Sequence, residues 1–211
     1  MNLKYGKQQL ELEEDRLPEF KILRPNEQVG LDNPRQAVED SLENPIDSRP
    51  LHKLAKERQP EEVVIIVNDI SRPTPYEVLL PPLLNKLEAA GITNEQITFI
   101  IATGIHDPHT KEQNREVFGT ELLNNYEFIS HDPDNNLVDL GELSSGNQLY
   151  LNKKVVEADL LLTLGVIAPH YFAGFSGGRK SILPGVAGRE SIEFNHSRMV
   201  DLLGNLPPIE K

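Results

Sequence analysis

The 211-residue sequence contains no cysteine. This absence excludes disulfides, thiolate zinc sites, iron–sulfur clusters ligated by the protein and a cysteine nucleophile. A metal bound by the protein itself must therefore use His, Asp, Glu or Lys side chains.

Long apolar runs and basic residues are also scarce. No stretch approaches the ~20 apolar residues that cross a bilayer, and the N-terminal segment is too polar for a signal peptide. The 33 acidic and 21 basic residues give a formal net charge of −12, which argues against non-specific nucleic-acid binding. We therefore expect a cytoplasmic protein with no membrane and no nucleic-acid partner. A local basic pocket remains compatible with this composition.

The sequence does contain the pattern of a folded α/β domain. Continuous apolar runs at 63–67, 97–102 and 158–166 predict strands that are buried on both faces of a parallel sheet. Helical patterns follow the first two runs, which is the βαβ arrangement. The expected fold class is therefore α/β, a parallel-sheet βαβ domain with helices on both faces. Alternating residues at 9–13 and 17–25 predict a small N-terminal β extension.

The remaining elements follow from capping and turn signals. Asn33 and Pro34 predict the start of a helix, and a second helix is expected over 49–58. The segment 76–91 predicts a helix that is broken or restarted at Pro81-Pro82. Further predictions, in chain order, are a helix over 110–118, a strand over 126–130, a strand or hairpin over 149–156, and a helix that begins near Arg189.

We expect one domain over residues 1–211, with the β extension at 1–30 and the α/β core at 62–200. The Pro-containing end of the chain is typical of the start of a linker, so we expect the native protein to continue.

The polar loops that follow the buried strands are the candidate functional segments, because ligands gather at the carboxyl ends of parallel strands. Residues 168–188 form a glycine-rich loop without helix or strand periodicity. No carboxylate lies between Leu160 and Arg189, whereas Arg179 and Lys180 are basic. Glycines at 174, 177 and 178 would let backbone N–H groups approach a ligand. This loop therefore predicts an anion site.

Common catalytic motifs do not fit this loop. A nucleotide-binding P-loop would need glycine where Arg179 stands. Residues 174–178 (GFSGG) have the spacing of a G-x-S-x-G nucleophile elbow, but that motif lies on a strand-to-helix turn and this segment has no helix or strand periodicity, so we assign no nucleophile role to Ser176. No H-E-x-x-H zinc peptidase motif is present.

Histidine is the second signal, because imidazole moves protons near neutral pH and binds borderline metals. His106, His170 and His196 lie in loops or at a loop–helix junction that should converge, beside Asp69, Arg72 and Lys180. We assign His52, His109 and His131 to structural or surface roles, with His109 the closest alternative to His106.

The segment His170 to Lys180 (HYFAGFSGGRK), followed by Leu183-Pro184-Gly185 and Asn195-His196, closely resembles the nickel-dependent lactate racemase family. Asp69-x-x-Arg72 and Thr103-Gly104-x-His106 support this resemblance. It covers nearly the whole chain, but only the N-terminal domain of that family. By the resemblance, the family's C-terminal domain, which closes over the active site, would be absent from these 211 residues.

The resemblance implies a nickel pincer nucleotide, a pyridinium mononucleotide that binds nickel through two sulfurs and a ring carbon. By the motif match, Lys180 would carry this cofactor through a thioamide and His196 would ligate nickel. The remaining cofactor-binding residues would be Asp69, Ser176, Gly177 and Gly178. Because the cofactor supplies the sulfur ligands, a protein without cysteine can hold nickel.

The implied reaction is racemisation or epimerisation of a small 2-hydroxy acid, most simply lactate, by proton-coupled hydride transfer to the cofactor. His106 and His170 would be the two bases that the two enantiomers require. Arg72 would hold the substrate carboxylate or polarise its oxygen, and Asp69 would orient Arg72 or a histidine. The expected partners are this substrate, the C-terminal domain and the cofactor-synthesis proteins.

Two alternatives remain open at the level of sequence. One is a cofactor-binding module without turnover, and the other is an unrelated α/β enzyme that binds a phosphate or a nucleotide. We expect the isolated fragment to be inactive.

Overall fold

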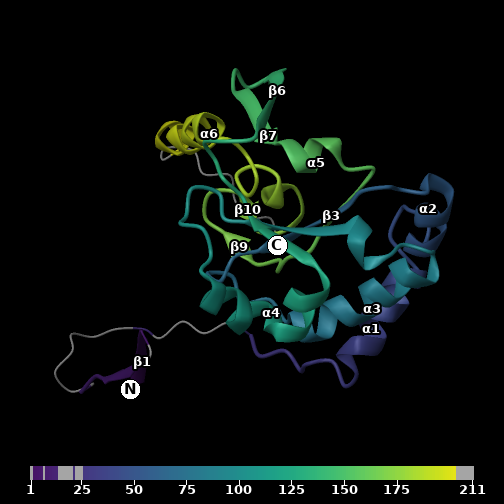
Figure 1. The fold of residues 1–211 in the computed structure, drawn as a ribbon. Helices are drawn as coiled ribbons and strands as arrows, with labels where there is room; N and C mark the ends of the chain where they lie inside the picture. The colour runs from purple at the N-terminus through teal and green to yellow at the C-terminus, as the bar shows by residue number, and fades with distance from the viewer. Residues whose placement is uncertain (1, 7, 14–20, 22–25, 203–211) are drawn as a thin grey trace. The chain divides into compact units, whose positions relative to one another are not determined.

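A computed structural model describes residues 2–6, 8–13, 21 and 26–202, without the side chains of 200–202. The chain divides into two compact units, residues 1–32 and 33–211 (Figure 1). In the first unit, β1 (Asn2–Tyr5) and β2 (Gln8–Glu11) form an antiparallel hairpin. This hairpin confirms a small N-terminal β extension, whereas most of the predicted strand at 17–25 lies outside the described residues.

A parallel sheet forms the centre of the second unit. In the described residues it has four strands in the order β5-β4-β3-β8. These are β3 (Val63–Asn68), β4 (Ile97–Ala102), β5 (Glu127–Ser130) and β8 (Leu160–Thr163). All three pairings are parallel, which confirms the predicted fold class.

Both faces of this sheet are covered, because β3 and β4 are apolar at nearly every position. On one face, alternate residues of β3 and β4 pack against α2 (Leu51–Arg58), α3 (Tyr76–Ala89) and α4 (Lys111–Asn125). The intervening residues pack against α5 (Lys153–Glu157) and Val186 on the other face. Figure 1 shows α3 and α4 on the side of the sheet opposite α5.

Helix α1 (Pro34–Glu43) begins as its capping residues predict, because the Asn33 side chain accepts a hydrogen bond from the backbone N–H of Gln36. The predicted break in α3 is wrong, since this helix continues through Pro81-Pro82. Pro81 has no N–H to donate to the carbonyl of Glu77, four residues earlier. Arg35 of α1 donates its Nη2–H to that carbonyl at 3.0 Å instead. The tertiary contact thus replaces the missing helical bond.

The C-terminal half of the second unit adds short elements around the glycine-rich segment. β6 (Leu137–Glu142) and β7 (Gln148–Asn152) form a hairpin. The predicted strand or hairpin over 149–156 is thus confirmed at 149–152, whereas 153–156 belong to α5. Within the glycine-rich segment, β9 (Pro169–His170) pairs with β10 (Gly174–Phe175). A 3₁₀ turn, Gly178–Ser181, follows, and α6 (Arg189–Leu202) begins where predicted.

Candidate active site at the carboxyl edge of the sheet

The strand order places the candidate site at a topological switch point. From β3 the chain continues to β4 and β5 on one side of the sheet, and it later returns to β8 on the other side of β3. The loops after β3 and β8 therefore follow the carboxyl ends of two neighbouring strands at the point where the strand order reverses, which is where α/β sheets bind ligands. These loops carry most of the site residues that the sequence predicts.

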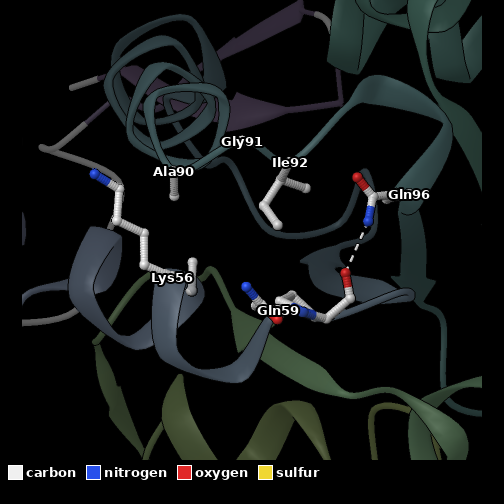
Figure 2. Close-up of a pocket in the computed structure, with 8 residues that line it drawn as sticks. Lys56, Gln59, Ala90, Gly91, Ile92 and Gln96 are labelled. Atoms are coloured by element: carbon white, nitrogen blue, oxygen red, sulfur yellow. Dashed lines mark hydrogen bonds between the residues drawn. The ribbon is translucent and has the colours of Figure 1, made fainter.

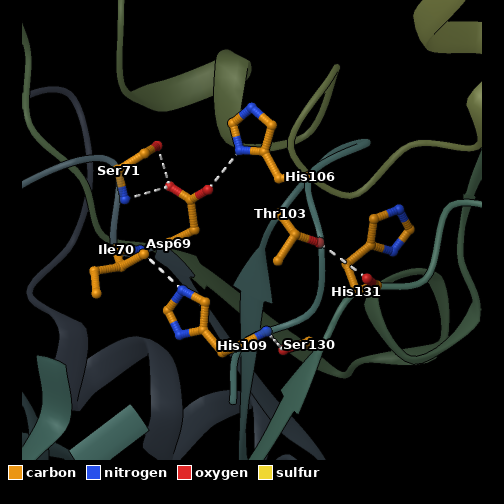
Figure 3. Close-up of polar contacts among 8 residues, drawn as sticks. All are labelled: Asp69, Ile70, Ser71, Thr103, His106, His109, Ser130 and His131. Atoms are coloured by element: carbon orange, nitrogen blue, oxygen red, sulfur yellow. Dashed lines mark hydrogen bonds and ion pairs between the residues drawn. The ribbon is translucent and has the colours of Figure 1, made fainter. Parts of the chain in front are cut away.

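Asp69 and His106 are in direct contact at this edge, although 37 positions separate them. The His106 Nδ1 atom lies 2.6 Å from Asp69 Oδ2 (Figure 3). The other Asp69 oxygen accepts hydrogen bonds from the backbone N–H and the hydroxyl of Ser71, at 3.2 and 2.6 Å. The Asp69 side chain is 7% exposed and that of His106 is 60% exposed. A buried carboxylate thus orients an accessible imidazole and leaves its Nε2 atom toward solvent.

His170 is held by the backbone of its own hairpin. Its Nδ1 atom accepts hydrogen bonds from the N–H groups of Phe172 and Ala173, at 3.2 and 3.1 Å. Because an amide N–H can only donate, Nδ1 carries a lone pair, and the neutral ring carries its proton on Nε2. Tyr171 stacks on the ring with the centroids 5.1 Å apart. His170 therefore presents an N–H donor, whereas His106 presents an acceptor.

Ser176 shapes the glycine-rich loop from inside. Its hydroxyl donates to the carbonyl of Val166 at 2.6 Å and accepts from the N–H of Ala168 at 2.9 Å. Both functions of the hydroxyl are used to tie the two limbs of the loop together. The Ser176 hydroxyl therefore stabilises the shape of the loop.

Two glycines in this loop occupy positions where a side chain would lie too close to neighbouring atoms. Gly177 has a φ of +77°, and a Cβ there would lie 3.2 Å from Ile167 Cγ1. At Gly185, a Cβ would lie 2.3 Å from the carbonyl oxygen of Ser181. The turn that carries Lys180 is closed by the Gly185 N–H, which donates to the Lys180 carbonyl at 3.2 Å.

The predicted basic residues and histidines influence one another electrostatically. Burial, and next the Arg72 guanidinium, lower the pKa of the Lys180 ammonium, while Asp69 acts in the opposite direction. Burial also lowers the pKa of His170, and the charges of Lys180, Arg72 and His196 lower it further. Desolvation and Lys180 lower the pKa of His196. The cluster thus favours neutral imidazoles, a lysine that loses its proton more readily, and a bound anion.

The sequence alone predicted no specific role for His131, whose ring hydrogen-bonds to the end of the glycine-rich segment. The ring is fully buried, its Nε2–H donates to the Ala187 carbonyl at 2.8 Å, and its Nδ1 lies 3.2 Å from Asn152 Nδ2. Thr103 donates its hydroxyl to the His131 carbonyl at 2.9 Å (Figure 3). These contacts join four segments that are distant in sequence, so local patterns contain no signal for them.

Neither of two surface hollows contains a predicted site residue. One, of about 290 Å³, lies near the amino ends of β3 and β4, where Gln96 Nε2 donates to the Pro60 carbonyl at 2.8 Å (Figure 2). The other, of about 360 Å³, is an apolar groove between α1, α2, α3 and β8. The candidate site is therefore an open cluster of polar groups on loops.

The donor set of the cluster bears on which metal or cofactor it could hold. Within residues 2–202, as far as they are described, no three His, Asp or Glu side chains lie together as a metal site. His196 offers one imidazole, and the Phe172 ring lies beside it with the centroids 6.1 Å apart. Such a site fits a metal whose other ligands come from an organic group.

No helix of the described chain has the length and apolar character needed to span a membrane.

Taken together, the parallel sheet and the basic, histidine-containing loops at its carboxyl edge define an α/β domain with a candidate ligand site on those loops. A family model described as the lactate racemase N-terminal domain matches residues 5–203. The chain belongs to this family.

Two curated relatives agree with this assignment. A lactate racemase from Lactiplantibacillus plantarum is 42% identical over 165 residues, which are 77% of this chain and 38% of that protein. A lactate racemase from Thermoanaerobacterium thermosaccharolyticum is 44% identical over 161 residues, which are 75% of this chain and 37% of that protein. The matched region is thus less than two fifths of each relative.

Solved structures show the same fold. The lactate racemase apoprotein from Thermoanaerobacterium thermosaccharolyticum matches with a TM-score of 0.78 and 40% identity, covering 92% of this chain and 45% of that chain. A crystal structure of a Thermotoga maritima protein matches with a TM-score of 0.65 at 20% identity, covering 82% of this chain and 44% of that chain. The second match supports the fold alone.

Proposed function

We propose that this chain is the cofactor-binding and catalytic part of a racemase for a small 2-hydroxy acid, most simply lactate. The observation that carries the proposal is the Asp69–His106 pair beside the cluster of Arg72, His170 and Lys180. A carboxylate-supported imidazole suits proton transfer, and two nearby cations suit a carboxylate substrate. The names of the two curated relatives support the same reaction.

The donor set fits the nickel pincer nucleotide that the resemblance implies. Lys180 would hold it through Nζ, since burial and Arg72 lower the pKa of this amine and increase its neutral, nucleophilic fraction. His196 would add an imidazole nitrogen to nickel, and the loop at Ser176, Gly177 and Gly178 would surround the nucleotide phosphate. When bound, the group supplies the reversible two-electron chemistry that interconverts 2-hydroxy and 2-keto acids.

The residues of the chain then bind the substrate and transfer its protons. Arg72 holds the substrate carboxylate. His106 removes the hydroxyl proton with Nε2, and the Asp69 carboxylate stabilises the imidazolium that forms. His170 first donates its Nε2–H to a substrate oxygen. To act as the base for the other enantiomer, it must release the two backbone N–H groups at Nδ1 and carry its proton there.

Loading and mutagenesis test this proposal. The chain is produced together with the cofactor-synthesis proteins, both alone and within a longer polypeptide of the length of the relatives. Intact mass and nickel content are then measured. We expect a mass increment on Lys180 with about one nickel per chain, and Lys180→Ala should lose both. Lys153→Ala on α5 is the matched control and should retain both.

Racemisation of D- and L-lactate tests the catalytic roles in the longer polypeptide. His106→Ala and His170→Ala should each abolish turnover while nickel is retained, whereas His52→Ala on α2 should remain active. Near-wild-type turnover of either site variant would remove that histidine from catalysis.

A binding module without turnover is the second candidate, because Lys180 and His196 could hold a cofactor whether or not the other histidines turn over a substrate. Loaded cofactor with no racemisation by the longer polypeptide would establish this alternative. An unmodified chain that binds ATP or NAD would instead indicate an unrelated nucleotide-binding enzyme.

A further inference from the structure

A second histidine in the loop after β4 has a very different environment from His106. His109 is half-buried, and its ring contacts Phe118 of α4 with the centroids 6.3 Å apart. Its backbone N–H donates to the hydroxyl of Ser130, at the end of β5, at 3.0 Å. This position places the ring under the loop that follows β3 (Figure 3).

Both ring nitrogens of His109 are used by hydrogen bonds. The backbone N–H of Ile70 donates to Nε2 at 2.8 Å, and Nδ1 lies 3.0 Å from Asn114 Oδ1. An amide N–H can only donate, so Nε2 must present its lone pair. A neutral His109 therefore carries its proton on Nδ1, and the Asn114 oxygen accepts that proton. His109 cannot take a proton from a substrate at Nε2 without losing the hydrogen bond from the Ile70 N–H.

The bond to Ile70 matters because few contacts join the two loops. Apart from the contact between Asp69 and His106, the hydrogen bonds of Asp69 and Arg72 within the described residues are internal to their own loop. Ser71 donates twice to Asp69, the Arg72 N–H donates to the Asp69 carbonyl at 3.1 Å, and the Thr74 hydroxyl donates to the Arg72 carbonyl at 3.1 Å. Among the described residues, the Asp69–His106 contact is the other hydrogen bond between the loops after β3 and β4. Loss of the Ile70 bond would leave that contact unsupported.

We propose that His109 is a positioning residue that fixes the backbone of the Asp69–Arg72 loop, so that Asp69 reaches His106 and Arg72 stays beside the cluster. The two histidines of one loop thereby have separate duties. His106 offers a free Nε2 to a ligand, and His109 uses Nε2 to hold the neighbouring loop. The hydrogen-bond assignment rests on geometry alone, whereas its effect on turnover rests on the proposed function.

Nuclear magnetic resonance of the ¹⁵N-labelled 211-residue chain tests the bond directly. Long-range imidazole spectra should show His109 protonated at Nδ1, and a coupling across the hydrogen bond should link His109 Nε2 to the Ile70 amide. A His109 ring protonated at Nε2, or an Ile70 amide that exchanges as fast as an unprotected one, would overturn the proposal. This measurement needs neither cofactor nor activity.

Matched variants separate the acceptor from the bulk of the ring. His109→Gln can place an amide oxygen near the position of Nε2, and it should keep the Ile70 amide protected. His109→Leu fills similar space without an acceptor and should speed exchange of Ile70 by about tenfold. Equal exchange rates of the Ile70 amide in the leucine variant and the wild type would contradict the hydrogen bond to His109. If the leucine variant does not fold, the His109 tautomer and the coupling to Ile70 in the wild type still test the hydrogen bond.

Turnover distinguishes positioning from direct catalysis in the loaded, longer polypeptide. His109→Gln should retain racemisation, and His109→Leu should lower kcat by up to about 100-fold with nickel content unchanged. A glutamine variant that keeps Ile70 protected yet has no activity would make His109 a catalytic base and overturn the positioning role. Absence of turnover in the wild type would count against the proposed function and leave the spectroscopic result intact.

Discussion

Replacement of His131 by leucine removes two buried hydrogen bonds behind the glycine-rich loop. The ring is fully buried between the Ala187 carbonyl, which accepts from Nε2–H, and the Asn152 amide, which donates to Nδ1. Leucine is similar in size but satisfies neither group. A buried polar group left without a partner costs about 1–3 kcal/mol, so the free energy of unfolding should fall by roughly 2–6 kcal/mol.

Urea unfolding followed by circular dichroism at pH 7.5 measures this loss. With a denaturant slope of about 2 kcal/mol per M, the midpoint should fall by about 1–3 M. The matched control is His52→Leu on α2, because in the described part of the chain the buried Nδ1 of His52 has no hydrogen-bond partner. That control should change the midpoint much less. Equal midpoints for the two variants would refute the calculation.

The same pair of proteins gives a pH test with a defined sign. Burial lowers the pKa of His131 from 6.5, while the Ala187 carbonyl, Asp132 and Asp134 act in the opposite direction. The unfolded chain therefore binds this proton more readily than the folded protein does. The contribution of His131 is fully present above pH 6.5, and it is lost as the pH falls below that value, by at most about 1.4 kcal/mol per pH unit.

The leucine variant lacks this titration, so its stability deficit relative to wild type should shrink between pH 7.5 and 5.5. A deficit that stays constant or grows as the pH falls would refute the assignment of His131 as a buried neutral histidine.

Two further substitutions test the loops around the site. Tyr76→Phe removes a buried hydroxyl that accepts from the Asn68 N–H at 2.6 Å and donates to the Asn68 carbonyl at 3.2 Å, and urea unfolding should show a loss of about 1–3 kcal/mol. Burial raises the pKa of Tyr76 to about 12, so wild type should lose stability relative to Tyr76→Phe as the pH rises above 10. Gly185→Ala puts a methyl group 2.3 Å from the Ser181 carbonyl oxygen, so amide exchange should show the turn around Lys180 opening while the sheet stays protected.

The sheet could be predicted because its signal is local. Val63 to Val67 form an unbroken β-branched run, and such a run has few alternatives to a strand buried on both faces. The start of α1 could also be predicted from the sequence, since Asn33 and Pro34 lie directly at the beginning of the helix. The position of the functional loops then followed from the general rule that ligands bind at the carboxyl ends of parallel strands.

Features that depend on distant partners could not be predicted in this way. Helix α3 continues through Pro81, and Arg35, on another helix, satisfies the Glu77 carbonyl that Pro81 cannot bond. The pairing of Asp69 with His106 joins two loops, and the motifs indicated only that both residues belong to the site. The expected cofactor and reaction rest on the family resemblance alone, because histidines, a lysine and glycines in loops are compatible with several chemistries.

The partner of each imidazole nitrogen explains why similar residues have different uses in this protein. A backbone N–H at one nitrogen forces the proton onto the other, as at His109 and His170, and a carbonyl fixes the proton where it lies, as at His131. In these three rings the nitrogen that accepts a hydrogen bond would lose that bond on protonation. At His106 the bonded nitrogen faces a carboxylate instead, and the Asp69 contact strengthens when Nε2 gains a proton. His106 is therefore the histidine of these four whose acceptor nitrogen, Nε2, is not used by a hydrogen bond within the described residues, so the proposed role predicts that its replacement abolishes proton transfer.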